Sequence, residues 1–430
     1  MDPLLSGDVG LAAVLIVVLK VVVAFAVLML GVMAMVWFER KLIADMQNRI
    51  GPNRAGPFGI LQTLADGLKL MFKEDLEPER SDPFVFKLAP FLALIPAFLV
   101  FAVIPVAGDF TDGSDGVVTM FGHETFMQVA DPQMGILFVL AMSSVAVYGV
   151  MLAGWSSGSK YPLLGSVRAT AQMVSYEASL GLSVAAVLLF SGTLSTNGIV
   201  VEQSGWAWNL WMTALVPFVI FVISATAELN RPPFDLVEAE QELVGGFHTE
   251  YSSFRFALFY LAEFLNTVTM SAVIVTLFLG GPSGPIPSGA PGWVADYVLP
   301  LIYFFAKLMV LLVMFVSFRA TLPRLRYDQL MDLGWKLLIP LSLGWLLLLS
   351  SIKVAIDVGW NPVLTGAATV AILALGALML RSSIRTAAAR HQAADPLSDP
   401  ALSDPALSDP DHTSNPGHTS NTDAIAGGGA

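Results

Sequence analysis

The sequence predicts an all-α, polytopic integral membrane protein, and three observations support this class. Of its 430 residues, 55% are hydrophobic and only 13% are charged, which is about half the charged fraction of a typical soluble domain. Apolar runs of roughly 20 residues recur along the chain, each long enough to cross a hydrocarbon layer of about 30 Å as a helix. The short alternating runs of a membrane β-barrel are not apparent.

Nine membrane spans are predicted, and the basic residues predict their orientation. The spans lie near residues 11–38, 84–106, 134–154, 173–191, 211–227, 256–279, 298–318, 337–353 and 362–380. The first run is longer than the apolar core of a signal peptide, so we expect it to be retained. Nearly all of the 22 Lys and Arg residues follow the odd-numbered spans. Because cytoplasmic loops carry this excess, the N-terminus is predicted outside and the C-terminus in the cytoplasm.

Three regions follow from these spans. Residues 1–360 are predicted to form a membrane domain of eight transmembrane helices, and residues 361–392 one additional C-terminal helix. Residues 393–430 repeat the motif SDPAL, a composition that buries too little apolar surface to fold, so this tail is predicted to be disordered.

The chain contains no cysteine. This excludes iron–sulfur clusters, thiolate-bound zinc and a cysteine nucleophile. Any redox centre that works with this chain must therefore lie on another chain, and no metal site is predicted from its five scattered histidines.

Residues 60–73 predict an amphipathic helix at the membrane interface. Gln62, Asp66, Lys69 and Lys73 fall on one stripe of such a helix, and the remaining side is apolar. The simpler alternative is a surface anchor without a further role. The preceding segment RIGPNRAGPFG favours a compact loop that holds Arg49 and Arg54 near the polar stripe.

Ionisable residues inside the spans are the second candidate feature. Glu177, Glu228, Glu263 and Lys307 fall within or at the ends of apolar runs, where a charge is costly unless it is paired or hydrated. A proton pathway and a static ion pair are both possible, and four such residues converging from the cytoplasmic side favour the pathway. Lys20 is expected to extend its side chain to the outer interface instead.

The third feature is the acidic stretch PFDLVEAEQELVGGFHTEY (233–251). Asp235, Glu238, Glu240 and Glu242 crowd together whether the segment is helical or extended. We therefore expect at least one of these carboxyl groups to have a raised pKa and to exchange a proton near neutral pH. The alternative is a solvated acidic loop, but the interleaved apolar residues favour a segment packed on one side.

These motifs resemble a known family. GILQTLADGLKLMFKE (59–74) and PFDLVEAEQELVGG (233–246) are similar to the two signature segments of the H-subunit family of bacterial NADH:quinone oxidoreductase, respiratory complex I, whose mitochondrial counterpart is NADH dehydrogenase subunit 1. Further similar motifs follow the same order, namely ERK, GPNRAGP, SYEASL, AELNRPPFD, FHTEYSS, LAEFLN and LPRLRYDQLM. The resemblance covers about residues 10–355.

The resemblance implies a non-redox subunit of a proton-translocating enzyme in a bacterial plasma membrane. It would form the chamber for ubiquinone or menaquinone, while FMN and iron–sulfur clusters are carried by partner subunits. Its implied partners are the peripheral-arm subunits that carry the terminal cluster and complete the quinone site, the small membrane subunits and the antiporter-like subunits, besides quinone and lipid. No nucleic acid is implied.

The resemblance also implies two groups of site residues. The quinone-binding group is Arg40, Arg54, Asp66, Lys69, Arg231 and Arg326, with Arg54 and Arg326 at the rim. The proton-coupling group is Glu177, Glu228, Asp235, Glu238, Glu240, Glu242 and Glu263.

Two alternatives remain at the level of the sequence. Related energy-converting hydrogenases, or complexes with another electron donor, use a similar subunit, although the full LPRLRYDQLM and GPNRAGP segments favour the quinone enzymes. An independent cation/proton antiporter would also explain buried charges, but it predicts two corresponding halves with broken helices, and no such internal repeat is apparent.

Overall fold

The computed structural model describes residues 2–5, 10–110, 114–235, 244–287 and 291–393. In chain order its elements are η1 (Pro3–Leu5), α1 (Leu11–Met46), η2 (Pro57–Gly59), α2 (Gln62–Met71), α3 (Pro83–Phe101), β1 (Val117–Met120), β2 (His123–Phe126), α4 (Gly135–Ser156), α5 (Lys160–Ser191), α6 (Thr196–Glu202), η3 (Ser204–Trp206), α7 (Asn209–Met212), α8 (Val216–Glu228), η4 (Gly246–His248), α10 (Ser253–Phe278), η5 (Val294–Val298), α11 (Leu299–Thr321), α12 (Tyr327–Asp332), η6 (Leu333–Leu338), α13 (Ile339–Val358) and α14 (Pro362–Ala393), where η marks a 3-10 or π-helical turn. The chain divides into two compact units, Met1–Pro362 and Val363–Ala430.

The predicted all-α membrane class is confirmed. Among the described residues, seven helices are long and apolar enough to cross a membrane, and a bent helix pair brings the total to as many as eight. In the second unit, α14 has a described apolar part, Pro362–Gly376, that is shorter than a span. Its crossing of the membrane as a ninth helix therefore stays a prediction, as does the orientation of the termini.

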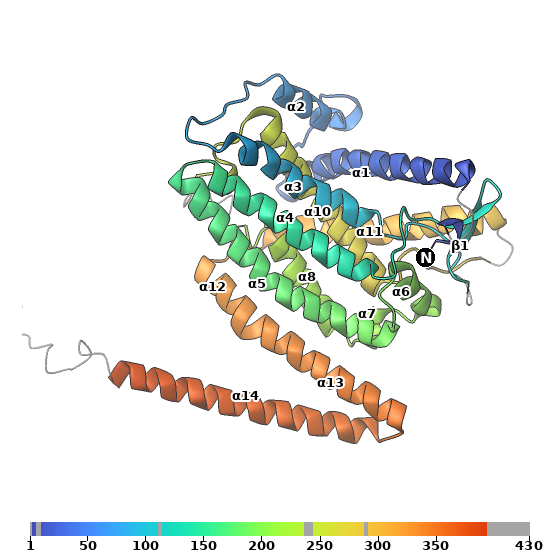
Figure 1. Cartoon of the computed structure of the whole chain (residues 1–430), viewed down its shortest axis with the longest axis vertical. Helices are drawn as coiled ribbons and strands as arrows, with labels where there is room; N and C mark the ends of the chain where they lie inside the picture. Colours follow the sequence, from blue (N-terminus) through green and yellow to red (C-terminus); the bar gives the residue numbers. More distant parts are fainter. Residues whose placement is uncertain (1, 6–9, 111–113, 236–243, 288–290, 394–430) are drawn as a thin grey trace, which may run out of the picture. The chain divides into compact units, whose positions relative to one another are not determined.

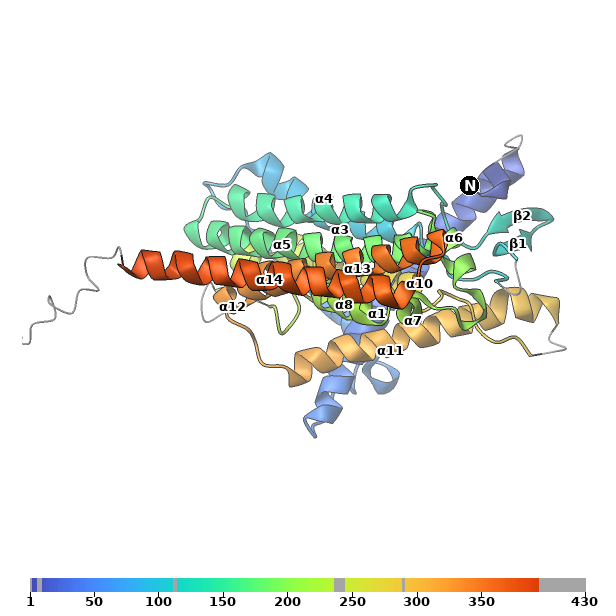
Figure 2. The ribbon, with the colours of Figure 1, turned by 90° about the horizontal axis from the view of Figure 1, so that it is seen from below.

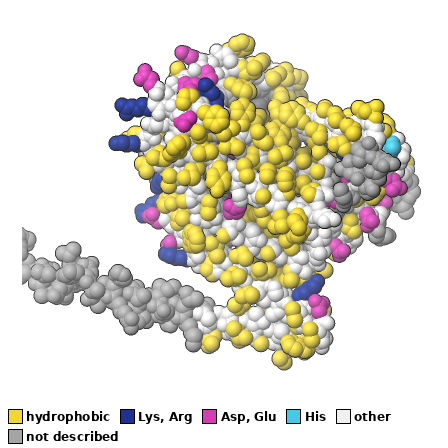
Figure 3. Space-filling model, viewed as in Figure 1, with side chains coloured by type: hydrophobic (Ala, Val, Ile, Leu, Met, Phe, Trp, Pro, Cys, Tyr) yellow, Lys and Arg dark blue, Asp and Glu magenta, His cyan; other side chains and the backbone are white. Residues whose placement is uncertain are grey.

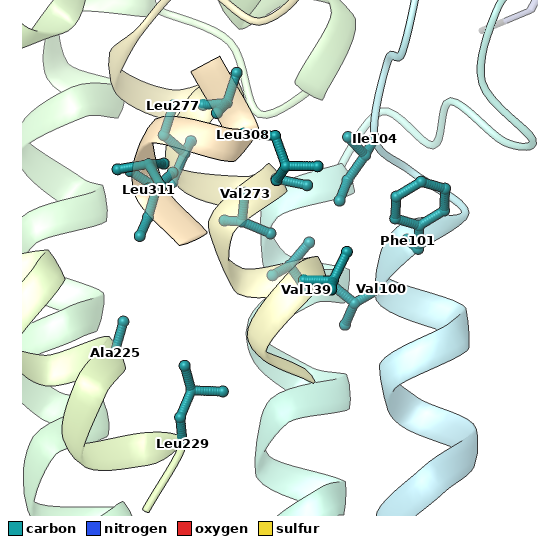
Figure 4. Packing of buried hydrophobic residues seen from close by; sticks show 14 of the residues in the cluster. Val100, Phe101, Ile104, Val139, Ala225, Leu229, Val273, Leu277, Leu308 and Leu311 are labelled. Carbon is teal, nitrogen blue, oxygen red and sulfur yellow. The ribbon is translucent and has the colours of Figure 1, made fainter. Parts of the chain in front are cut away.

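The helices pack side by side around α10. In Figure 1 and Figure 2, α3, α4 and α5 run next to one another. The apolar window of α10 is 83% buried, against 17–50% for the other candidate spans, so α10 is the central helix. Val100 of α3, Val139 of α4 and Val273 of α10 pack in this core (Figure 4).

The fifth predicted span, 211–227, is not one straight helix. Ser204–Met212 and Val216–Glu228 are bent by 73° relative to each other. At the break, Ala214 and Leu215 have φ values of 57° and 66°, a left-handed conformation that is uncommon for residues other than glycine. The continuous apolar run hid this break, because neither residue is a typical helix breaker.

One end of the first unit carries a β-hairpin that the sequence did not predict; we call it the hairpin end, and the opposite end the α2 end. β1 and β2 pair antiparallel, with Val117 opposite Phe126 and Met120 opposite His123. Figure 1 shows the hairpin beside the N-terminal segment. The strands are only four residues long, too short for the alternation of a strand to stand out among apolar runs.

Lys20 lies against this hairpin, and the expectation that it reaches the outer lipid interface is wrong. Its side chain is buried, its Nζ lies 3.0 Å from Asp2 Oδ2, and it donates a hydrogen bond of 2.5 Å to Thr125 Oγ1. Because the carboxylate of Asp2 lies beside it inside the protein, the positive charge of Lys20 is balanced without contact with solvent.

Candidate functional site

Charged side chains gather at the α2 end. Figure 3 shows most of the visible Lys and Arg, together with Asp and Glu, along one edge of a largely hydrophobic face, while further Asp and Glu lie at the opposite edge. Local sequence signals build this end: Asp82 caps α3 by accepting hydrogen bonds from the backbone N–H groups of Phe84 and Val85, at 3.1 and 3.2 Å. The helix ends around this edge therefore bring distant charged residues together.

Arg231 is the centre of a buried ion network that joins three helices. Its guanidinium, 1% exposed, lies 2.5 Å from Glu39 Oε2 of α1 and 3.3 Å from Glu263 Oε1 of α10. Arg319 of α11 pairs with the other oxygen of Glu39. Arg231 also lies over the Phe264 ring, 4.5 Å from its centroid, a favourable position for a cation. Removing one partner from such a network leaves an uncompensated buried charge.

Electrostatics keep Arg231 charged. Burial acts to lower the pKa of its guanidinium, but the carboxylates of Glu263 and Glu39 outweigh burial and raise that pKa. The residue therefore acts as a fixed positive charge.

A second ion pair joins α2 to α1. Arg40 Nη1 lies 2.6 Å from Asp66 Oδ2, and Gln62 donates a 3.1 Å hydrogen bond to Asp66 Oδ1. Burial opposes ionisation of Asp66, but the hydrogen bonds from Arg40 and Gln62 lower its pKa overall. Asp66 is therefore an anion throughout the neutral pH range.

The predicted amphipathic helix forms as α2, and it is held by polar contacts. Trp37 Nε1 donates to Phe58 O at 2.9 Å, and Thr63 Oγ1 donates to Met33 O at 3.3 Å. The apolar side of α2 is exposed, as shown by Leu61, Leu64, Leu68 and Met71. Because its polar side contacts α1 and its apolar side faces outward, α2 is more specifically attached than a simple surface anchor.

Two further carboxylates, the buried Glu228 and the partly buried Glu177, lie among the helices beyond this network. Glu228 at the end of α8 accepts a hydrogen bond from Ser143, and Glu177 of α5 accepts one from Ser144. The two carboxyl groups are close enough to interact electrostatically. Two adjacent serines of α4 thus donate hydrogen bonds to glutamates on two different helices, α8 and α5.

Glu228 also lines two cavities. The first, of about 80 Å³, is bounded by the polar residues Glu228, Asn230, His248, Tyr260, Glu263 and Asn266. The second, of about 30 Å³, shares Glu228 and Asn266 and reaches Ser143. The first volume is enough for several water molecules, and its polar groups can hydrogen-bond them. This arrangement can exchange protons between carboxyl groups.

The start of the acidic stretch is anchored beside the network. Asp235 is buried, and its Oδ2 lies 3.1 Å from Arg324 Nη2. Gln172 Nε2 donates to Phe234 O at 3.0 Å and to Ala227 O at 2.8 Å, which ties the segment to α5. Glu238, Glu240 and Glu242 lie outside the described residues, so the predicted crowding of these carboxylates stays a prediction.

Other predicted site residues lie at the surface. Arg54 and Lys69 are exposed, and Arg326 is exposed and pairs with its near neighbour Asp328. These positions suit a rim or an outward-facing wall, and the structure brings none of the three into the network around Arg231.

Lys307 lies apart from the glutamates, so its predicted convergence with them is wrong. Its Nζ donates hydrogen bonds to the carbonyl oxygens of Leu279, Gly281 and Ser283, at 2.7, 2.9 and 2.7 Å. Leu279 follows Glu263 by 16 residues along α10, which corresponds to about 24 Å of helix. Lys307 thus satisfies carbonyl groups left unpaired where α10 ends.

Several residues of the site were missed by reasoning from the sequence, among them the following six. They are Glu39, Ser143, Ser144, His248, Arg319 and Arg324. Glu39 stands beside Arg40 and could have been found from that neighbour. Nothing in the apolar run around the two serines indicates that they contact glutamates. Each arginine is one of several basic residues in its region, so its sequence position does not single it out.

The fold and the site define a polytopic helical membrane protein in which an ion network at one end leads to carboxylates inside the helix bundle. The chain belongs to the NADH dehydrogenase family, whose sequence profile matches residues 19–350.

Curated relatives agree with this assignment. The chain is 50% identical to the H subunit of the NADH-quinone oxidoreductase of Frankia alni, over 91% of its length and 84% of the relative. It is also 50% identical to the proteins of the same name from Frankia casuarinae, over 88% and 81%, and Streptomyces avermitilis, over 79% and 73%. The resemblance found in the sequence is thereby confirmed, and with it the prediction of a membrane subunit of an NADH-quinone oxidoreductase complex.

Proposed function

We propose that this chain forms the quinone chamber of the complex at its α2 end and couples quinone reduction to proton translocation. The observation that carries the proposal is a series of polar groups from the Arg40–Asp66 pair to the cavity lined by Glu263 and Glu228. Tyr260 links this pair to the buried Arg231 network, because it interacts with Arg40, Glu39 and Glu263. Its inner members Glu39, Arg231 and Glu228 are buried, and buried charges of this kind are costly in a membrane and typical of a functional path.

The quinone-binding roles follow the positions of the charges. Arg40, Asp66 and Lys69 would line the chamber on the side of α1 and α2, with Arg231 as a fixed positive charge behind them. Arg54 and Arg326, which are exposed, would lie at the rim. The exposed apolar side of α2 suits a quinone that enters from lipid.

Proton coupling is assigned to the carboxylates. Reduction of a quinone by two electrons consumes two protons, so the chamber changes its charge during each turnover. Glu263, Glu228 and Glu177 would respond by exchanging protons, with Asp235, Glu238, Glu240 and Glu242 as the acidic group beside the chamber. Carboxyl groups that interact with one another titrate together, so one local change can move a proton at a neighbouring site.

The remaining partners are those that the family resemblance implies, and the lack of cysteine requires only that any iron–sulfur cluster lie on another chain. Electrons would come from FMN and iron–sulfur clusters on peripheral-arm subunits, and small membrane and antiporter-like subunits would continue the proton path. The quinone would be ubiquinone or menaquinone, and the location a bacterial plasma membrane.

Purification of the tagged chain from its native membrane tests this assignment. Peripheral-arm subunits that carry flavin and iron–sulfur clusters, with NADH-driven quinone reduction, are the expected result. Recovery of nickel–iron hydrogenase subunits would select the alternative complex, and recovery of the chain alone with cation/proton exchange would select an antiporter.

Replacing Arg40 with Ala should raise the apparent KM for quinone roughly tenfold with a smaller effect on kcat, because a hydrogen bond to a charged group contributes about 1.5–3 kcal/mol. Since Asp66 has a lowered pKa, the effect should be the same from pH 6 to 8. The measurement is quinone titration of the purified complex. Arg49→Ala, which removes only an exposed contact with Gln47, is the control. An unchanged KM in the Arg40 variant would place quinone elsewhere.

A further inference from the structure

His248 lines the first cavity but is not one of the residues of the proposed proton path. It ends η4, a turn within the second half of the acidic stretch. Thr249 Oγ1 donates to Gly246 O at 2.7 Å and accepts from Gly245 N at 3.2 Å, and Tyr251 N donates to His248 O at 3.0 Å. The backbone on both sides of the ring is therefore fixed.

The turn is also pressed against α5. A Cβ atom at Gly165 would lie 2.7 Å from the Cα of Gly246, a distance that real Cβ atoms do not adopt. Only glycine allows this close approach. The contact between α5 and η4 therefore fixes the position of the His248 backbone beside the cavity.

The imidazole packs between aromatic rings and faces the cavity. Its centroid lies 5.1 Å from that of Phe247 and 5.4 Å from that of Phe256, both edge to face. Glu228 of α8 and Glu263 of α10 line the same cavity. These rings fix the orientation of the imidazole without using its nitrogens. The imidazole also hydrogen-bonds to the backbone of His248 itself, an interaction that acts to raise its pKa.

Among the described residues, four charged or titratable groups line this cavity with His248 or act on its pKa. They are Asp235, Glu228, Glu263 and the phenol of Tyr260. The helices α3, α4 and α5 contribute only Ala93, Ala146, Val150 and Met173 to the cavity. Burial lowers the pKa of His248 although Asp235 acts to raise it, so the ring is neutral at pH 7, with one nitrogen as donor and the other as acceptor.

We propose that His248 is a proton-transfer residue that connects Asp235 with the cavity carboxylates Glu228 and Glu263. In one transfer, the O–H bond of a protonated Asp235 breaks as an N–H bond forms on His248. The imidazolium then gives the proton of its other nitrogen to the carboxylate of Glu228 or Glu263, and the ring returns to its neutral form. No electron moves, and the path runs equally in reverse.

This inference rests on the proposed carboxylate path and adds a group to it. A histidine surrounded by aromatic rings can also serve only as packing, and the two roles differ in their dependence on pH. A packing role predicts lower stability in a variant without any change in the shape of the pH profile. A transfer role predicts the loss of a titrating group from that profile.

The test is His248→Gln in the intact complex, with His248→Asn as a second variant that keeps a polar side chain. The expected result is normal recovery of the complex and a decrease of about tenfold or more in coupled quinone reduction at pH 7. The acid limb of the wild-type profile, expected below pH 6.5 because the pKa of His248 is lowered from that value, should be absent. His123→Gln, at an exposed position of β2, is the matched control and should match the wild type.

Glu228→Gln, measured in parallel, separates the two hypotheses. If Glu228→Gln is impaired while His248→Gln retains wild-type rates and profile, the inference about His248 is wrong and the proposed function stands. If Glu228→Gln is fully active, the proposed carboxylate path itself fails. Loss of assembled complex in both His248 variants would assign the residue to packing and overturn its transfer role.

Discussion

Replacing Glu228 with Gln is expected to reduce proton-coupled quinone reduction by about 100-fold in a complex that assembles normally, since a positioned acid or base contributes roughly 10²–10⁴-fold. Glutamine keeps the size of the side chain and can still accept the hydrogen bond from Ser143, but it cannot take up a proton. The measurement is NADH-driven quinone reduction together with proton uptake into sealed vesicles.

The matched control for this variant is Glu202→Gln, because Glu202 is an exposed carboxylate at the end of α6. We expect wild-type rates and wild-type proton uptake from it. Normal coupling in the Glu228 variant would contradict the proposed carboxylate path.

The Arg231→Met variant is expected to destabilise the subunit by about 3–5 kcal/mol, the usual effect of removing one partner from a buried ion pair. Glu39 would retain Arg319, but Glu263 would lose the partner that lies 3.3 Å away. The measurement is the thermal inactivation midpoint of the purified complex and the amount of complex recovered from membranes.

Two further variants serve as controls for this prediction. Arg326→Met removes an exposed ion pair with Asp328 and should have almost no effect. The double variant Arg231→Met with Glu263→Gln should recover part of the lost stability, because it also removes the negative charge that faced Arg231. Equal midpoints for wild type and Arg231→Met would mean that the network does not hold these helices together.

Long apolar runs made most of the helix bundle predictable. A run of about 20 apolar residues allows little besides a spanning helix, and α1, α3, α4, α10 and α11 follow their predicted positions. The break at Ala214 and Leu215 depends on tertiary packing, and the sequence around it has no distinctive breaker. The hairpin was missed because its strands are short.

The site was predictable where its partners share one helix and unpredictable where they do not. Gln62 and Asp66 are four residues apart, and their hydrogen bond follows from helical geometry. The pair between Arg231 and Glu39 joins residues 192 positions apart, and no periodicity reports such a contact. The resemblance named Arg231 but not its partner, so the network required the fold.

The central helix α10 has its two ends tied to other parts of the chain. Near its start, Ser253 Oγ donates to the carbonyl oxygens of Leu70 and Lys73, at 3.0 and 2.8 Å. Beyond its end, Lys307 donates to three carbonyl oxygens. A piston-like displacement of α10 along its axis would break these hydrogen bonds. A signal that starts at Glu263 is therefore expected to travel by reorientation of side chains and relocation of charge, while the helix that carries it stays in place.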